Sequence, residues 1–182
     1  MNEALRNELE RMREADQAIR GEAMEVARTH GLESPEYAEV RARGIALQDQ
    51  HTARLIEILE SHGWPAVSEV GEKAAGGAFL LLQHAHHDVQ KRFLPLLREA
   101  TAAGEAKPTD LPLLEDRIRM QEGRPQRYGS QLTRGPDGKP TLWPIEDEAH
   151  VDARRGEVGL EPLADYLRRF GIQEDPPGEA SA

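Results

Sequence analysis

The chain of 182 residues carries a formal net charge of −10, and 38% of its residues are hydrophobic while 31% are charged. This length predicts one domain with a core of its own, and the composition is that of a folded chain. The acidic balance disfavours a nucleic-acid partner, because phosphate contacts need a basic face. The absence of cysteine excludes disulfides, thiolate metal ligands and a cysteine nucleophile.

The N-terminal sequence MNEALRNELERMREAD is charged and has a helical pattern, without the apolar stretch of a secretory signal. The longest apolar run covers residues 78–82. It is far shorter than the roughly 20 residues that a helix needs to cross a bilayer. We therefore expect a cytoplasmic protein with no membrane partner.

Apolar residues recur at helical spacing over residues 2–30. A second helix is predicted to start at the Ser34-Pro35 pair, an N-cap followed by proline at the first helical position, and to end near residue 61. Three more helices are predicted over about 67–87, 88–103 and 110–122. These five helices predict a mostly α fold, as an antiparallel bundle or array with short loops.

The pattern changes towards the C-terminus. Residues 127–133 and 140–145 look extended and flank a turn rich in glycine and proline, which predicts a small β-hairpin. Two short helices are predicted to follow, over about 147–156 and 161–170. Residues 173–182 are polar and rich in proline and glycine, so we expect a disordered tail after a single globular domain of residues 1–172.

The segment QHAHHD at residues 83–88 holds three of the seven histidines. If one helix runs through it, His84, His87 and Asp88 share a face. Such a face could bind a divalent metal ion, or Asp88 could orient His84 as a general base. The alternative is a partly buried, hydrogen-bonded structural histidine. The motif is short and brings no second set of ligands, so we assign no metal site.

Asp116 lies beside the apolar stripe of the predicted helix over 110–122. A carboxylate next to a core needs a partner, and Arg117, a histidine or Tyr128 could supply one. Two interpretations stay open. Asp116 either forms a structural clamp with an arginine, or it takes part in catalysis or ligand binding.

Hydrogen-bonding side chains are concentrated in the segment QRYGSQ at residues 126–131. In an extended segment, residues 126, 128 and 130 share one face. Gly129 allows a close approach of the backbone to a neighbour. Such a segment, laid over a histidine on a helix, would form a small-molecule pocket, and the alternative is an ordinary polar hairpin edge.

Two further acids lie on inward-facing stripes, Asp16 in the first helix and Asp49 in the second. Carboxylates in such places need compensation, and Arg20 and Arg54 lie one turn away from them. Together with His84 and Asp116, these acids have the composition of a carboxylate–histidine metal site. The ExxH pairs of di-iron bundles are absent, however, so neither a metal ion nor a cofactor is expected.

The spacing of these residues resembles that of a bacterial domain-of-unknown-function family over about residues 5–170. The resemblance is carried by QHA at 83–85, LxDR at 114–117, GxxQxYGxQ at 123–131 and PIED at 144–147. Ser130 stands where threonine is usual, and His51 stands where asparagine is common. The resemblance implies no established activity. It implies only which polar positions recur: Asp16, Asp49, Gln83, His84, Asp116, Arg117, Gln126, Tyr128 and Gln131.

These residues together predict a small-molecule site with acid–base chemistry, for hydrolysis or elimination. We expect His84 to be the general acid or base, Asp116 its partner, and Tyr128 the donor to a developing oxyanion. The side chains expected to position the substrate are Gln83, Arg117, Gln126 and Gln131. The alternative is a non-enzymatic helical interaction protein, such as an immunity, regulatory or toxin-associated partner, whose acidic surface binds a basic protein.

Overall fold

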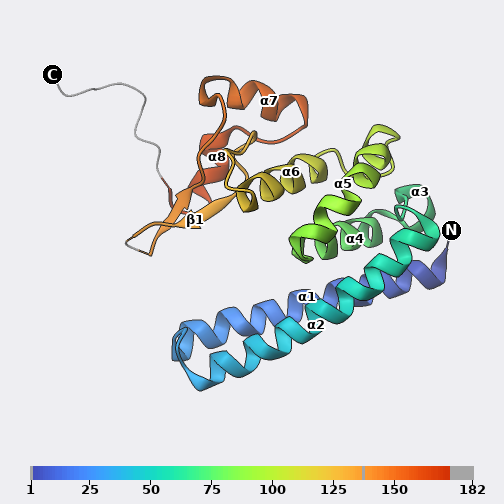
Figure 1. The fold of residues 1–182 in the computed structure, drawn as a ribbon, viewed down its shortest axis with the longest axis horizontal. Coiled ribbons are helices and arrows are strands. Elements are labelled where there is room, and N and C mark those ends of the chain that lie inside the picture. Colours follow the sequence, from blue (N-terminus) through green and yellow to red (C-terminus); the bar gives the residue numbers. More distant parts are fainter. Residues whose placement is uncertain (1, 137, 173–182) are drawn as a thin grey trace. The chain divides into compact units, whose positions relative to one another are not determined.

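The computed structural model describes residues 2–136 and 138–172. Over these residues the chain forms eight α-helices, one 3-10 helix and a two-stranded sheet, which confirms the mostly α fold (Figure 1). Its contacts divide it into two compact units, Met1–Lys107 and Pro108–Ala182. The predicted single domain stays a prediction, and the predicted disordered tail lies outside the described residues. No helix in the described part of the chain is long and apolar enough to cross a membrane.

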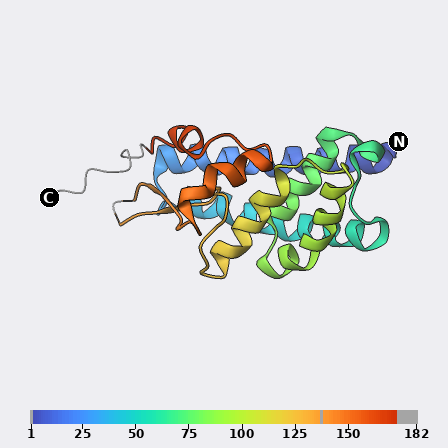
Figure 2. The ribbon, with the colours of Figure 1, turned by 90° about the horizontal axis from the view of Figure 1, so that it is seen from above.

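The first unit is built on a long antiparallel helix pair, α1 (Glu3–His30) and α2 (Pro35–His62), which lie side by side in both ribbon views (Figures 1 and 2). The predicted start of α2 is confirmed, since the Ser34 hydroxyl accepts a hydrogen bond from the backbone N–H of Tyr37 at 3.1 Å. Gly63 ends the helix in a left-handed conformation with φ of 79°. Local capping chemistry therefore sets both ends of α2.

The core of the first unit lies where α4 (Glu72–His84) packs against α1 and α2. Buried side chains come from the N-terminal part of α1, the C-terminal part of α2 and most of α4: Leu5, Leu9, Met12, Leu55, Ile58, Leu59, Ala74, Ala78, Phe79, Leu81 and Leu82. Gly77 allows the close approach of α4 to α1, since a Cβ there would lie 3.1 Å from the Leu9 carbonyl oxygen. The small residues of α4 thus bring its C-terminal end close to α1.

The prediction of one helix over residues 67–87 is wrong. The chain forms a single turn, α3 (Val67–Val70), and then α4, with Gly71 between them at φ of 83°. A second break follows at Ala85 and His86, which are extended, before α5 (His87–Ala102) begins. The break at Gly71 was not predicted, whereas the boundary predicted at residues 87–88 lies slightly later than the observed one.

The second unit contains α6 (Asp110–Gln121), a short hairpin, and three short helices: η1 (Glu148–His150), α7 (Val151–Glu157) and α8 (Leu163–Arg168). Strands β1 (Leu132–Arg134) and β2 (Pro140–Leu142) are antiparallel and pair Thr133 with Thr141. The predicted hairpin is confirmed, but its strands are shorter than predicted. Gln126 forms an isolated parallel bridge with Ile145. Residues 127–131 form a loop, in which the amides of Arg127, Tyr128, Ser130 and Gln131 bond to side chains.

The core of the second unit is small. Val151, Leu163 and Leu167 are its buried centre, and partly buried apolar residues of the hairpin and of α8 pack around them. Gly129 approaches this core closely, with φ of 69°, and a Cβ there would lie 2.7 Å from Leu163 Cδ1. The close backbone approach expected at this glycine is confirmed, and a side chain at this position would clash.

The close packing of α4 on α1 can be tested with two adjacent glycines of α4. Gly76 has no atom within 4 Å of an added Cβ, so Gly76→Ala should stabilise the protein by about 1 kcal/mol through helix propensity. Gly77→Ala gains the same propensity but presses on the α1 backbone, so we expect it to be less stable than Gly76→Ala by about 1–3 kcal/mol. Urea denaturation of both variants measures the difference, and equal stabilisation would contradict the close packing.

Candidate functional site

His84 is the last residue of α4, and a buried glutamine fixes its position. Gln90 on α5 is 1% exposed, and its side-chain Nε2 donates to the carbonyl oxygens of Gln83 and Ala85 at 2.9 and 3.0 Å. These are carbonyls that a helix end leaves without intrahelical partners. Gln90 therefore holds the turn after α4 in place and fixes the backbone that carries His84.

The His84 ring pairs with Asp16 on α1, a residue 68 positions away in sequence. Its Nδ1 lies 3.1 and 3.0 Å from the two carboxylate oxygens of Asp16. The Asp16 residue is 3% exposed, whereas the His84 side chain is 15% exposed. A carboxylate on Nδ1 favours the tautomer with its proton there, so Nε2 of the neutral ring is left as the base.

Two further side chains of α1 donate to the same carboxylate. Arg20 Nε lies 3.2 and 3.1 Å from the two oxygens, and Gln17 Nε2 lies 3.1 Å from one of them. Burial acts to raise the pKa of Asp16, but the His84 bond, the positive charges of His84 and Arg20, and the Gln17 bond together lower it below its ordinary value. Asp16 is thus held as an anion that orients the imidazole. The expected Asp16–Arg20 pair is confirmed.

The idea that His84, His87 and Asp88 share one helical face is wrong, because the extended residues Ala85 and His86 separate α4 from α5. His86 instead pairs with Asp49 on the surface, with Nε2 3.0 Å from Oδ1. Among residues 2–136 and 138–172, no group of three or more histidine, aspartate or glutamate side chains is arranged to hold a metal ion.

His51, another histidine of the first unit, has no hydrogen-bond partner among the described residues, unlike His84. His51 on α2 is 8% exposed, and its buried Nδ1 makes no hydrogen bond to any described residue. Burial lowers the pKa of His51 below its ordinary 6.5, and the negative charge of Asp16 offsets part of this effect. His51 is therefore a neutral ring in the electrostatic field of Asp16.

A groove starts at Asp16 and follows the seam between α1 and α2 towards Ile45. Its volume is about 180 Å³. Every residue lining it belongs to α1 or α2, and Arg20 and Arg41 are the two basic ones. A buried anion, its arginine partner and an open space therefore lie together in the first unit.

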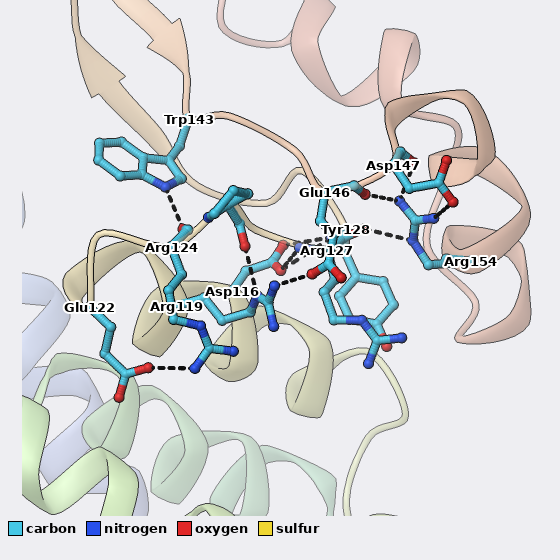
Figure 3. A network of polar contacts seen from close by, with 11 residues as sticks. Asp116, Arg119, Glu122, Arg124, Arg127, Tyr128, Trp143, Glu146, Asp147 and Arg154 are labelled. Atoms are coloured by element: carbon cyan, nitrogen blue, oxygen red, sulfur yellow. Dashed lines mark hydrogen bonds and ion pairs between the residues drawn. The ribbon is translucent and has the colours of Figure 1, made fainter.

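Asp116 is the buried carboxylate of the second unit, fully removed from solvent on α6. Its oxygens accept hydrogen bonds from the backbone N–H groups of Arg127 and Tyr128 at 2.6–3.2 Å (Figure 3). They also accept from the backbone N–H of Ser130 at 3.1 Å and from its hydroxyl at 3.0 Å. Burial raises the pKa of Asp116, and these four donors act in the opposite direction. The partners expected for Asp116 were side chains, whereas the partners observed are mainly backbone amides.

The side chains of Gln126 and Gln131 form hydrogen bonds within this loop. Gln126 is fully buried, and its Nε2 donates to the carbonyl oxygens of Gln131 and Trp143 while its Oε1 accepts from the Gln131 N–H. The Gln131 side chain donates to the Ser130 hydroxyl at 3.0 Å. Both glutamines are thus used to hold the loop, and these bonds account for their burial.

The loop directs Tyr128 and Arg127 away from the buried carboxylate. The Tyr128 ring is half-buried, with the Arg127 guanidinium 5.7 Å from its centre, and burial raises the pKa of its phenol. Arg155, which is 1% exposed, donates a hydrogen bond to the Tyr128 carbonyl oxygen. Arg154 donates to the carbonyl oxygens of Arg127, Glu146 and Asp147 (Figure 3). These two arginines fix the backbone that carries Tyr128.

The structure thus sorts the predicted site residues into two groups. Gln83 and His84 belong to the first unit, and Asp116, Arg117, Gln126, Tyr128 and Gln131 belong to the second. His84 has Asp16 as its partner, and Asp116 meets Tyr128 through the tyrosine's backbone. Pairing of His84 with Asp116 stays a prediction. Sequence reasoning missed Gln90 and Arg155. It grouped Asp16 with His84 as a possible metal site, but did not predict the direct pair of the two side chains.

Fold and site define a mostly helical protein with a buried histidine–aspartate pair in one unit and an aspartate-centred loop in the other. The chain belongs to the family described as "Family of unknown function (DUF6624)", whose profile matches residues 3–176. This match confirms the resemblance to a domain-of-unknown-function family. No curated protein and no solved structure matches the chain.

The anchoring role of Asp116 predicts a large cost for its neutral analogue. In Asp116→Asn, an amide NH₂ would face backbone N–H donors, and a buried donor would be left without an acceptor. We expect the free energy of unfolding of the second unit to fall by about 2–4 kcal/mol. Asp165 provides a control, because its side chain is 42% exposed and pairs with Arg168 one turn away, so Asp165→Asn should cost less than about 0.5 kcal/mol. Urea denaturation followed by amide NMR signals measures both, and equal costs would contradict the anchoring role.

The lowered pKa of His51 predicts a specific pH dependence. As the pH falls below 6.5, His51 takes up a proton more readily in the unfolded chain than in the folded protein. The stability that comes from the neutral, buried His51 ring is therefore fully present above pH 6.5 and is lost on acidification. Between about pH 7.5 and about pH 5.5, wild type should lose at most about 1.4 kcal/mol more than His51→Asn. Urea denaturation at the two pH values checks this. Parallel losses in the two proteins would show that His51 titrates alike in the folded and unfolded states.

Proposed function

We propose that this protein binds a small molecule in its first unit and transfers a proton through His84. The observation that carries the proposal is the bond from His84 Nδ1 to both oxygens of buried Asp16. The other ring nitrogen, Nε2, makes no hydrogen bond to the described residues, and the side chain keeps some solvent access. An imidazole fixed on one side by a carboxylate and free on the other is the arrangement that general acid–base catalysis uses.

Asp16 takes the orienting role that the sequence suggested for Asp116. Its pKa is lowered, so it remains an anion and stabilises the imidazolium that forms when Nε2 accepts a proton. Arg20 and Gln17 keep the carboxylate in place while the ring charge changes. The proton would come from water in a hydrolysis or from a carbon acid in an elimination, and these are the two reaction classes that we propose, in a cytoplasmic protein.

The second unit has a supporting part in this proposal. Asp116, Gln126 and Gln131 order the loop, and Tyr128 remains the candidate donor to a developing oxyanion because its raised pKa keeps the phenol protonated. Gln83 and Arg117 remain candidate substrate-binding residues. The proton-transfer role rests on the first unit alone, so it can be tested there.

The role of Asp16 can be tested in ¹⁵N NMR spectra of the histidine rings. In the neutral His84 ring of wild type we expect the proton on Nδ1, and in Asp16→Asn we expect this tautomer preference to be lost. The variant should also lower the free energy of unfolding by about 1–3 kcal/mol, because the partly buried bond from Arg20 loses its charged acceptor. A neutral ring that carries its proton on Nε2 in wild type would end the general-base proposal.

Thermal denaturation with a panel of metabolites tests ligand binding. A ligand at 100 times its Kd stabilises wild type by about 2.7 kcal/mol, and His84→Gln should lose this response while it stays folded. The matched control is His86→Gln, which removes an exposed histidine paired with Asp49 on the surface and should keep the response. If no metabolite stabilises wild type and His84→Gln simply unfolds at lower temperature, the pair is structural. The alternative of a non-enzymatic interaction protein then gains support.

A further inference from the structure

The groove beside Asp16 arises from small residues in the seam of a helix pair. Its α2 wall carries Tyr37, Val40, Gly44, Ile45 and Gln48, with the three- and four-residue spacing of one helical face. Its α1 wall carries Ala23 and Ile19 above Asp16. In an antiparallel pair, large side chains normally fill this seam. Here Ala23 and Gly44 leave it open, and an added Cβ at Gly44 would make only an ordinary contact, 3.6 Å from Ile19.

Two arginines give the groove a positive charge. Arg41 lines it, is exposed, and makes no hydrogen bond or ion pair with any described residue. Arg20 uses its Nε for Asp16, and its Nη2 makes only a long contact of 3.5 Å to Gln48. In this acidic unit several arginines are paired with a carboxylate, among them Arg28 and Arg54. Arg43, next to the groove in sequence, is paired with Glu22. Arg41 differs from it because its donors are all available.

The rest of the lining is apolar or neutral, apart from Asp16. Ile19, Val40 and Ile45 provide aliphatic surface, Tyr37 provides an aromatic ring, and Gln48 provides an amide. The Asp16 carboxylate already has donors from Arg20, His84 and Gln17. Its repulsion of a second anion is therefore reduced, and the two arginines outweigh its single charge. This combination suits a ligand with one anionic end and one apolar end.

We propose that this groove binds a small molecule with an oxyanion head, a carboxylate or a phosphate, on a short apolar body. Arg41 and the Nη groups of Arg20 contact the head, and the Ile19, Val40 and Tyr37 side chains contact the body. The inference names a ligand class for a groove that shares Asp16 with the site of the proposed function, and it rests on that function only through this shared residue. Binding itself needs no turnover, so it is tested separately.

The test uses four probes that share one benzene ring. Benzoate and phenyl phosphate carry an anion, benzamide is neutral and benzylamine is a cation. Each is titrated into the ¹⁵N-labelled full chain, and the amide signals of residues 19–23 and 37–48 are followed. We expect benzoate or phenyl phosphate, but not benzamide or benzylamine, to shift these signals, and the stronger of the two identifies the head group. If benzamide or benzylamine shifts them as strongly, or if neither anion does so up to its solubility, the proposal is overturned.

Two variants separate charge from space. Arg41→Gln should weaken binding of the anionic probe roughly fivefold, which is the effect of one partly exposed charged contact. Its control is Arg11→Gln, which removes the same charge from an exposed position of α1 outside the groove. Gly44→Leu should abolish binding by filling the seam, while its gain in helix propensity keeps the helix pair folded. Its control is Gly21→Leu, since Gly21 lies on α1 with no atom within 4 Å of an added Cβ.

The outcomes distinguish this inference from the proposed function. Equal weakening by Arg41→Gln and Arg11→Gln, or probe binding that survives Gly44→Leu, overturns the groove as the binding site. Benzoate binding that is lost with both groove variants establishes the site, even if His84 then proves to have no role in proton transfer. Conversely, the tautomer of His84 is measured without any ligand, so the result for the proposed proton-transfer role does not depend on binding in the groove.

Discussion

A carboxylate removed from water must be surrounded by donors, and each unit of this protein contains one. Asp16 and Asp116 are 3% and 0% exposed, and each is met by at least three donors. The donors differ in kind. Asp116 is held by backbone amides and a hydroxyl, which keep their protons at every physiological pH. Asp16 is held partly by an imidazole, whose protonation can change. The same physical constraint therefore orders a loop in one unit and orients a histidine ring, the proposed proton-transfer group, in the other.

Local chemistry made the long helices predictable. The Ser34-Pro35 start of α2 and its end at Gly63 depend on residues within one turn, and both follow from the sequence. The sequence predicts a helix boundary at residues 87–88, but its observed position directly after His84 could not be predicted in this way. It is stabilised by the Gln90 side chain, which becomes a capping group only when α5 packs against the end of α4. The partner of His84 lies on a different helix, and no periodicity within either helix specifies that crossing.

The loop at residues 126–131 shows a second limit of sequence reasoning. From the sequence alone, its many hydrogen-bonding side chains indicate either ligand contacts in a pocket or an ordinary polar hairpin edge. In the structure, the Gln126 side chain bonds to the Gln131 backbone and the Gln131 side chain bonds to the Ser130 hydroxyl. The loop's amides bond to Asp116. The residues were correctly singled out as unusual. Their use was not predictable, since the same composition serves a ligand or a buried carboxylate equally well.

Asp16 and His51 also mark the point along the helix pair where burial stops. Beyond Asp16 on α1 no residue is buried, and before His51 on α2 only Val40 is, so the far half of the pair is held mainly by contacts between its two helices. Local opening there costs less free energy than opening of the half that packs on α4. A molecule lying in the seam adds contacts to both helices at once. Ligand binding in the groove is therefore linked to the stiffness of the far half of the α1–α2 pair. Slower amide hydrogen exchange in that half is the physical sign of a filled groove.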